Sequence, residues 1–153
     1  MESHQSHGSH YRMLALNLAV SAVIMYLVMF AMIDTLGEFY NNLNMLYMTM
    51  MMLAPMGALM LLMMGSMYGN RRLNLVLYAV FAALFVLGTV GTRAQAGIGN
   101  VQFLRSMIPH HSGAILMCRE ASVSDPEIIA LCGNIQRSQR AEIDQMKRIL
   151  ERY

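Results

Sequence analysis

The sequence has few charged residues and little of the residue types that mark several familiar protein classes. Of its 153 residues, 13% are charged and 56% are hydrophobic, with no tryptophan and two cysteines. Soluble domains carry about 25% charged residues, so this composition predicts a membrane protein. The net charge of +2 is too small for the basic surface that nucleic-acid binding needs. Two cysteines are too few for a disulfide-rich scaffold or a zinc site of four thiolates.

Long uncharged runs fill the first part of the chain. They cover residues 13–33, 45–67 and 73–90, and each is close to the roughly 20 residues that cross a bilayer as a helix. The sequence therefore predicts a three-helix transmembrane region over residues 13–92. The first run is no cleavable signal peptide, because it is too long and Asp34 follows it directly. A polar tail, residues 1–12, precedes it and contains His4, His7 and His10, which could bind a metal loosely.

The distribution of arginine predicts the orientation in the membrane. Arg12, Arg71 and Arg72 lie on one side of the three spans, and Arg93 and Arg105 lie on the other. Because cytoplasmic loops are enriched in Lys and Arg, we expect a cytoplasmic N-terminus in the inner (plasma) membrane. Three spans then place the C-terminal part in the periplasm or outside the cell.

Methionine is the most over-represented residue, with 18 of 153 positions. In the second span, seven methionines follow one helical face: Met45, Met48, Met52, Met56, Met60, Met63 and Met67. Such a face could pass a soft metal across the bilayer. Packing is the favoured interpretation, since methionine is an ordinary apolar side chain in lipid and no charged residue enters the spans. Pro55 lies within this span and should kink it.

The polar C-terminal segment, residues 100–153, predicts a hairpin of two helices. Asn100 can cap the first helix, and Asp125-Pro126 is typical of the start of the second. Pro109 within the first helix should bend it and leave the carbonyl of Arg105 unpaired. Two helices cannot enclose their apolar faces, so we expect at least two copies to pair into a four-helix bundle. The predicted fold class is thus all-α, three transmembrane helices followed by this hairpin.

The first helix of the hairpin gathers soft metal ligands. Met107, His110, His111 and Met117 fall on one face or its edge. Thioether and imidazole groups favour copper, above all Cu(I), whereas calcium and magnesium prefer oxygen. The alternative is that Met107 and Met117 are core residues, since methionine often fills gaps in apolar cores.

These residues also carry a resemblance. The segment Met107-Ile-Pro-His-His-x-x-Ala-Ile-x-Met117, followed by Ile135-x-x-x-Gln139-x-x-Glu142-Ile-x-x-Met146, resembles the family called domain of unknown function 305 over roughly residues 101–150. The resemblance implies a ferritin-like hairpin and a role in periplasmic copper binding and resistance. It makes Met107, His110, His111, Met117 and Met146 the candidate ligands. Larger family members carry two such hairpins in tandem. This is consistent with pairing of the single hairpin here with the hairpin of a second copy.

Four further side chains of the hairpin have open roles. Cys118 and Cys132 should lie near each other across the hairpin, as a disulfide or as two buried free thiols, and Cys118 could also bind metal. Glu142 could accept a hydrogen bond from a ligating imidazole, or Gln139 and Glu142 could edge the core and face water. A diiron oxidase site would need several Glu and Glu-x-x-His pairs, which the hairpin lacks.

Together these patterns predict a membrane-anchored protein that binds copper on an extracytoplasmic hairpin, for buffering, resistance or transfer to a periplasmic copper carrier. It would be a binding protein, not an enzyme, and would work as a homo-oligomer. The alternative is a membrane scaffold or sensor subunit, whose hairpin is an oligomerisation module without metal.

Overall fold

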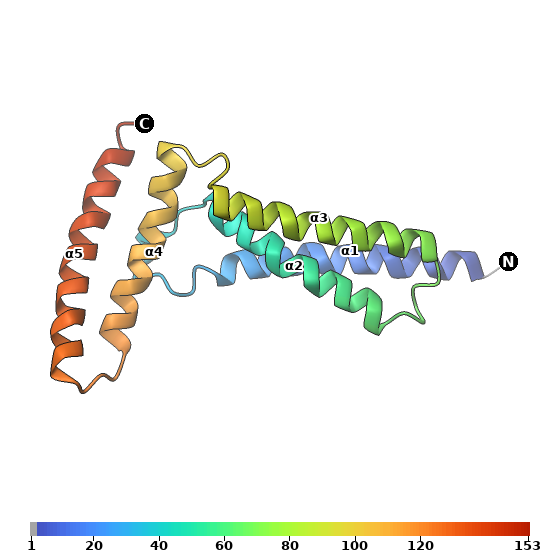
Figure 1. Cartoon of the computed structure of the whole chain (residues 1–153), viewed down its shortest axis with the longest axis horizontal. Coiled ribbons are helices and arrows are strands. Elements are labelled where there is room, and N and C mark those ends of the chain that lie inside the picture. Colours follow the sequence, from blue (N-terminus) through green and yellow to red (C-terminus); the bar gives the residue numbers. More distant parts are fainter. Residues whose placement is uncertain (1–2) are drawn as a thin grey trace. The chain divides into compact units, whose positions relative to one another are not determined.

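The chain folds into α-helices joined by short connections (Figure 1). The computed structural model describes the backbone of residues 3–153 and the side chains of residues 9–153. Over that range it contains five α-helices, one 3-10 helix and no strand: α1 Ser3–Val28, η1 Leu36–Glu38, α2 Leu43–Met63, α3 Arg71–Ala94, α4 Asn100–Glu120 and α5 Pro126–Leu150. The predicted all-α class is confirmed, with three apolar helices followed by a hairpin.

The structure divides into two compact units. The first runs up to Val28 and resumes over Leu46–Ala96, and the second combines Met29–Met45 with Gly97–Tyr153. The second unit is therefore discontinuous in sequence. We call its early segment, residues 29–45, the linker, because it joins α1 to α2.

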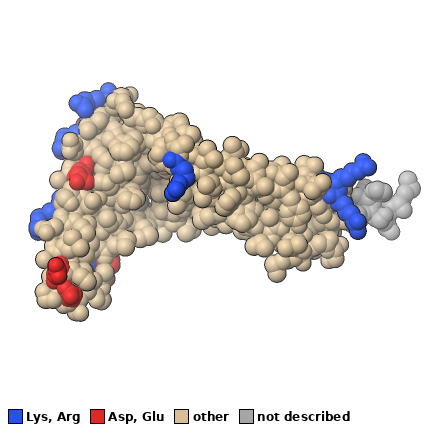
Figure 2. All heavy atoms as spheres, viewed as in Figure 1, with Lys and Arg blue, Asp and Glu red and all other residues tan. Residues whose placement is uncertain are grey.

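Within the described residues, three helices are long and apolar enough to cross a membrane, over Ser9–Val28, Leu43–Met63 and Arg71–Ala94. Most of their surface is exposed to the surroundings, as lipid-facing helices require. Figure 2 shows the contrast on one face, where charged side chains gather on α4 and α5 and the surface of α1–α3 is almost entirely uncharged.

The observed helix ends differ from the predicted ones. Helix α1 begins at Ser3, so the polar segment before Met13 continues the helix, and it ends at Val28 instead of Ile33. The apolar residues after Val28 belong to the linker, where buried Phe30 stacks on Phe39 with ring centroids 4.2 Å apart. His10 is half-buried near the start of α1, whereas the side chains of His4 and His7 lie outside the described residues.

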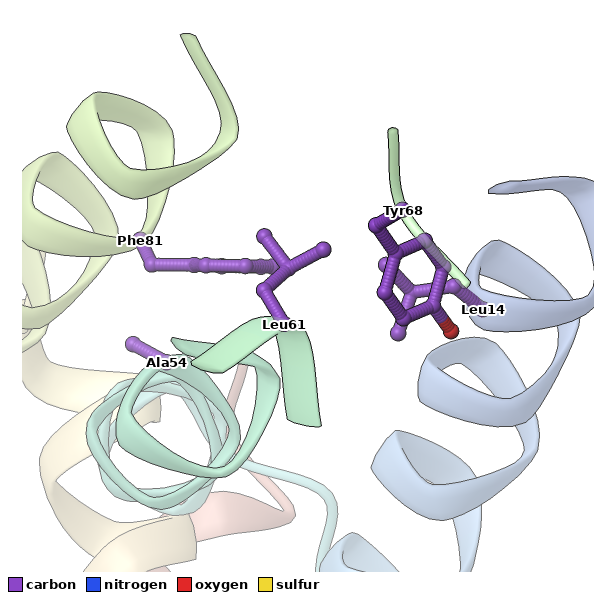
Figure 3. Close-up of a cluster of buried hydrophobic side chains, with 5 residues drawn as sticks. All are labelled: Leu14, Ala54, Leu61, Tyr68 and Phe81. Carbon is purple, nitrogen blue, oxygen red and sulfur yellow. The ribbon is translucent and has the colours of Figure 1, made fainter. Parts of the chain in front are cut away.

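A small apolar cluster joins α1, α2 and α3 (Figure 3). The ring of Phe81 points towards Leu61, and Leu14 lies beside Tyr68. Helices α2 and α3 pack closely, since a Cβ added at Gly88 would lie 2.8 Å from the Tyr47 carbonyl oxygen. Helix α2 continues through Pro55.

The methionines of α2 do not share one environment. Met60 and the following Met67 pack against the cluster of Figure 3, whereas Met48, Met52 and Met63 are exposed. Some of these methionines therefore pack against other helices and others are exposed, as expected for apolar side chains of a helix that could face lipid.

The caps of the hairpin are partly as the sequence predicts. The Asp125 carboxylate accepts hydrogen bonds from the amides of Glu127 (2.8 Å) and Ile128 (3.2 Å), with Pro126 as the first helical residue. The prediction that Asn100 caps α4 is wrong. The cap is Gly99, and the Asn100 side chain instead donates to the Tyr153 hydroxyl at 2.9 Å.

The linker covers one side of the hairpin. Tyr40 packs against the hairpin core, which consists of Leu104, Ile108, Ile115, Ile143 and Met146. The Asn42 side chain donates to the Arg105 carbonyl at 3.5 Å, which is the group that Pro109 frees. The Leu43 amide donates to Gln102 Oε1 at 3.0 Å. The hairpin thus has a third layer, which reasoning from two helices alone missed.

Candidate metal site

The hairpin has one side that the linker does not cover. On α4, Phe103, His110 and Met117 are exposed at a spacing of seven residues, which is two helical turns and therefore one line along the helix. On α5, Ile128 and Leu131 are exposed near the loop, with Glu142 further along the helix. We call these six residues the open face. It is apolar apart from His110 and Glu142.

The two histidines occupy different environments. His110 is exposed on the open face, whereas the His111 side chain retains 12% of its accessible surface and turns towards α5. Their ring centroids are 6.0 Å apart. Consecutive residues on a helix point about 100° apart, so one imidazole can face the surroundings while the next enters the seam between the helices.

The buried nitrogen of His111 has an incomplete set of partners. His111 Nδ1 lies 3.0 Å from Glu142 Oε2, close enough for an ionic contact, but the pair does not have hydrogen-bond geometry. Among the described side chains, this Nδ1 is the only buried nitrogen or oxygen atom without a hydrogen-bond partner. Buried polar groups normally have one, because an unpaired group keeps the full cost of losing its water.

The protonation of His111 is shifted towards the neutral form. Burial lowers its pKa, the Glu142 carboxylate acts in the opposite direction, and the neighbouring His110 adds to the lowering. The net effect is a pKa below the usual value for histidine. A neutral imidazole has a free lone pair, which is the form that binds metals.

The three candidate methionines lie in two places. Met146 is 8% exposed within the hairpin core, and Met107 packs against that core from α4. Met117 is 58% exposed near the other end of α4. Met107 and Met117 are ten residues apart, or about 15 Å along a helix axis. Within one chain, Met107 therefore lies on the core side of α4, whereas Met117 lies on the open face with His110.

Oxygen and thiolate groups do not form a metal cluster by themselves. No group of three or more His, Cys, Asp or Glu side chains in the described part of the chain is placed to hold an ion. Glu142 is exposed and contacts His111, and Gln139 is half-buried on the same helix.

The two cysteines meet near the loop of the hairpin. Both are free thiols and both are half-buried. The hydrogen bond with the Cys132 thiol raises the pKa of Cys118, and burial adds to the effect. The predicted proximity across the hairpin is thus observed, without a bond between the sulfur atoms.

A network of charges fixes the linker to the hairpin. Arg140 Nη2 lies 2.6 Å from Asp34 Oδ2, and its other terminal nitrogen binds Glu38. Arg119 also binds Asp34, and Ser112 Oγ accepts from the Asp34 amide and donates to Glu38. The sequence pattern predicted no contact of Asp34 or Glu38 with the hairpin. Their occurrence as the sole acids between residues 3 and 92 was the available signal.

Glu38 is ionised within this network. Its side chain is 1% exposed, and burial alone would raise its pKa. The hydrogen bonds from Ser112 and Arg140, with the positive charges of Arg140 and Lys147, outweigh burial and lower the pKa below the usual value for glutamate. The linker is therefore held by a charged carboxylate at neutral pH.

The chain has recognisable relatives. It is 32% identical over 120 residues to an uncharacterized protein of Acanthamoeba polyphaga mimivirus, an alignment that covers 77% of each chain. The alignment is longer than segment 92–152, so the similarity continues into the sequence before residue 92. No solved structure matches the chain. Residues 92–152 match the family described as domain of unknown function (DUF305), and the chain belongs to that family.

Proposed function

We propose that this protein is a membrane-anchored copper-binding protein that holds Cu(I) through Met and His of its hairpin, for buffering, resistance or transfer to a carrier. The observation that carries the proposal is the buried His111 nitrogen without a hydrogen-bond partner, beside His110 and about one helical turn from Met107. An unpaired donor atom among soft ligands is what a metal would satisfy.

The chemistry of these side chains fits copper better than zinc or calcium. The lowered pKa of His111 keeps the imidazole neutral, so a metal has no proton to displace at neutral pH. The Nδ1 lone pair would then bind the metal directly, and the Glu142 carboxylate, 3.0 Å away, would offset part of the positive charge of the ion. Thioether sulfur from Met107 adds a soft ligand that favours Cu(I).

The position of Met117 supports a two-copy assembly. Met117 is too far along α4 to join Met107 on one ion within a chain, at about 15 Å of helix rise. A second hairpin packed antiparallel on the open face would bring the Met117 of one copy near the Met107 of the other. The same contact would cover Phe103, Ile128 and Leu131, which are exposed here.

We also propose that the hairpin lies outside the cytoplasm. With three spans, the linker and the hairpin are on the same side of the membrane, as their mutual packing requires. Arg12, Arg71 and Arg72 favour a cytoplasmic location for the opposite side. A reporter that works only outside the cytoplasm should therefore be active when fused after Tyr153 and inactive when fused to the N-terminus. Reversed activity would contradict this orientation.

Copper binding is tested with the full-length protein in detergent, by competition for Cu(I) against a coloured chelator. We expect stronger binding of Cu(I) than of Zn(II), and a loss of at least about tenfold in Cu(I) affinity for His110→Ala/His111→Ala and for Met107→Leu. Leu replaces Met in a core at a cost usually below about 1.5 kcal/mol, so the fold should survive.

The matched control is Met64→Leu, which changes a methionine off the α2 face and should leave the affinity unchanged. Unchanged Cu(I) affinity in Met107→Leu would make that methionine a packing residue. No Cu(I) binding by the wild-type protein would reject the proposal. Assembly through the open face without copper would favour the scaffold or sensor function, since exposed apolar faces mark interaction surfaces.

A further inference from the structure

The two cysteines lie where the hairpin closes. Cys118 is in the last turn of α4, which ends at Glu120, and Cys132 is in the second turn of α5, which begins at Pro126. Residues 121–125 connect the helices, and the Asp125 cap fixes the start of α5. The copper proposal does not use either thiol.

The geometry holds the two thiols against each other. The Cys118 and Cys132 side chains lie close together across the seam between α4 and α5. The same two helices are tied further along by His111 and Glu142. Both cysteines are half-buried, so a small reagent can reach them. Thiols fixed in contact by a short connection react with each other as an intramolecular pair, at high effective concentration.

We propose that Cys118 and Cys132 are a redox-active pair that closes into an intramolecular disulfide when the protein meets a disulfide-bearing oxidant. One thiolate attacks a sulfur atom of the oxidant, which forms a mixed disulfide and releases one thiolate of the oxidant. The second cysteine then attacks the sulfur of the first and releases the other thiolate. The two protein thiols lose two electrons and two protons, and the oxidant disulfide gains both to become two thiols.

A disulfide between Cys118 and Cys132 would also stabilise the closed end of the hairpin. The bond would close a loop of about 15 residues. It should reduce the equilibrium constant for opening of this end of the hairpin by roughly 100-fold.

The test uses metal-free, full-length protein in detergent, so its outcome does not depend on copper binding. The reduced protein is incubated with oxidised glutathione, blocked with a maleimide and weighed by mass spectrometry. We expect both thiols to react with the maleimide before oxidation and neither afterwards, with a loss of two hydrogen atoms and no glutathione attached. Cys118→Ser and Cys132→Ser should each stop at a glutathione adduct on the remaining thiol.

Three results would overturn the proposal. They are two glutathione adducts on the wild-type protein, a disulfide between two chains on a non-reducing gel, and full maleimide labelling after prolonged oxidation. Helix content by circular dichroism shows whether each serine variant is folded, and Cys118→Ala and Cys132→Ala repeat the test with a different side chain. Amide exchange in α4 and α5 near the loop should slow on oxidation of the wild-type protein alone.

Discussion

Replacing Arg140 by methionine should release the linker from the hairpin. Arg140 binds both Asp34 and Glu38, and methionine keeps most of its aliphatic length while removing the charge. The change leaves the Glu38 carboxylate, which is 1% exposed, with Ser112 and a more distant Lys147 at 3.9 Å. Asp34 keeps Arg119.

The expected magnitude follows from the burial of the partners. An exposed ion pair contributes up to about 1 kcal/mol, whereas removing one partner of a buried pair costs about 3–5 kcal/mol. Here the carboxylates are buried and the Arg140 side chain is 39% exposed, so water can partly replace it. We expect Arg140→Met to destabilise the docked linker by about 2–3 kcal/mol, which lies between these two limits. That is a change of roughly 30- to 150-fold in the opening equilibrium of the linker.

Two backbone amides report this opening directly. The Asp34 amide donates to Ser112 Oγ, and the Leu43 amide donates to Gln102 Oε1, so both are protected only while the linker is docked. Hydrogen exchange of the full-length protein should accelerate at both amides in Arg140→Met. The control is Arg137→Met, since Arg137 binds exposed Asn134 on its own helix and should leave the linker unchanged.

Exchange that stays within about twofold of wild type at both amides would refute the reasoning, since 1.4 kcal/mol already corresponds to tenfold. A double-mutant cycle with Glu38→Gln separates the interaction between Arg140 and Glu38 from other effects of the Arg140→Met substitution. The cost of Arg140→Met should be smaller when Glu38 is already neutral, because less buried charge is then left unpaired.

Three further changes test other parts of the structure. Because folding lowers the pKa of Glu38, its contribution to stability is complete above the unfolded pKa near 4.5 and is lost as the pH falls through the lower folded pKa. The protection factors of the linker amides, which are corrected for the intrinsic exchange rate at each pH, should therefore fall in acid, and Glu38→Gln should remove that dependence. Gly88→Ala should lower the thermal stability in detergent by about 1–3 kcal/mol, since its Cβ would lie 2.8 Å from a carbonyl oxygen, whereas Gly65→Ala, with its nearest atom at 3.6 Å, should not. Asn42→Ala should destabilise the docked linker by about 1–2 kcal/mol, as measured by amide exchange in the linker. The reason is that the Asn42 side chain accepts from the Met45 amide at the start of α2 and donates to the Arg105 carbonyl. An unchanged exchange rate would show that water replaces the Asn42 side chain at both groups.

The parts of the fold that follow from local patterns were predictable. Uncharged runs marked the three spans, and Asp125-Pro126 marked the start of α5. Even the carbonyl freed by Pro109 was predicted, although its partner was not. Each depends on residues within a few positions of one another, where periodicity and capping rules apply.

Contacts between distant segments were not predictable in the same way. Nothing local to Asp34 or Glu38 points to Arg140, more than 100 residues later. The apolar residues 29–33 extended the first predicted span because apolar periodicity cannot tell a lipid-facing residue from one buried in a linker. Phe30 is such a residue, because it is buried within the linker.

The metal ligands stay a prediction, but the structure shows where their side chains lie. Sequence spacing placed Met107, His110, His111 and Met117 on one face of α4 or its edge, whereas Met107 packs against the core and Met117 is exposed. It could not show that His111 enters the seam beside Glu142 while His110 stays exposed, because this depends on the side that the linker covers. The rise per residue of a helix already implied that Met107 and Met117 lie about 15 Å apart along α4.

The discontinuous second unit also has a consequence for biosynthesis. The linker, residues 29–45, is synthesised before α3, whereas Arg119 and Arg140 follow later in the chain. Asp34 and Glu38 therefore have no partners until the hairpin has been made. Contacts so distant in sequence form slowly, because the intervening chain must be ordered first. A chain cut short before α5 would keep an acidic linker without Arg140, an exposed segment that proteases can cleave.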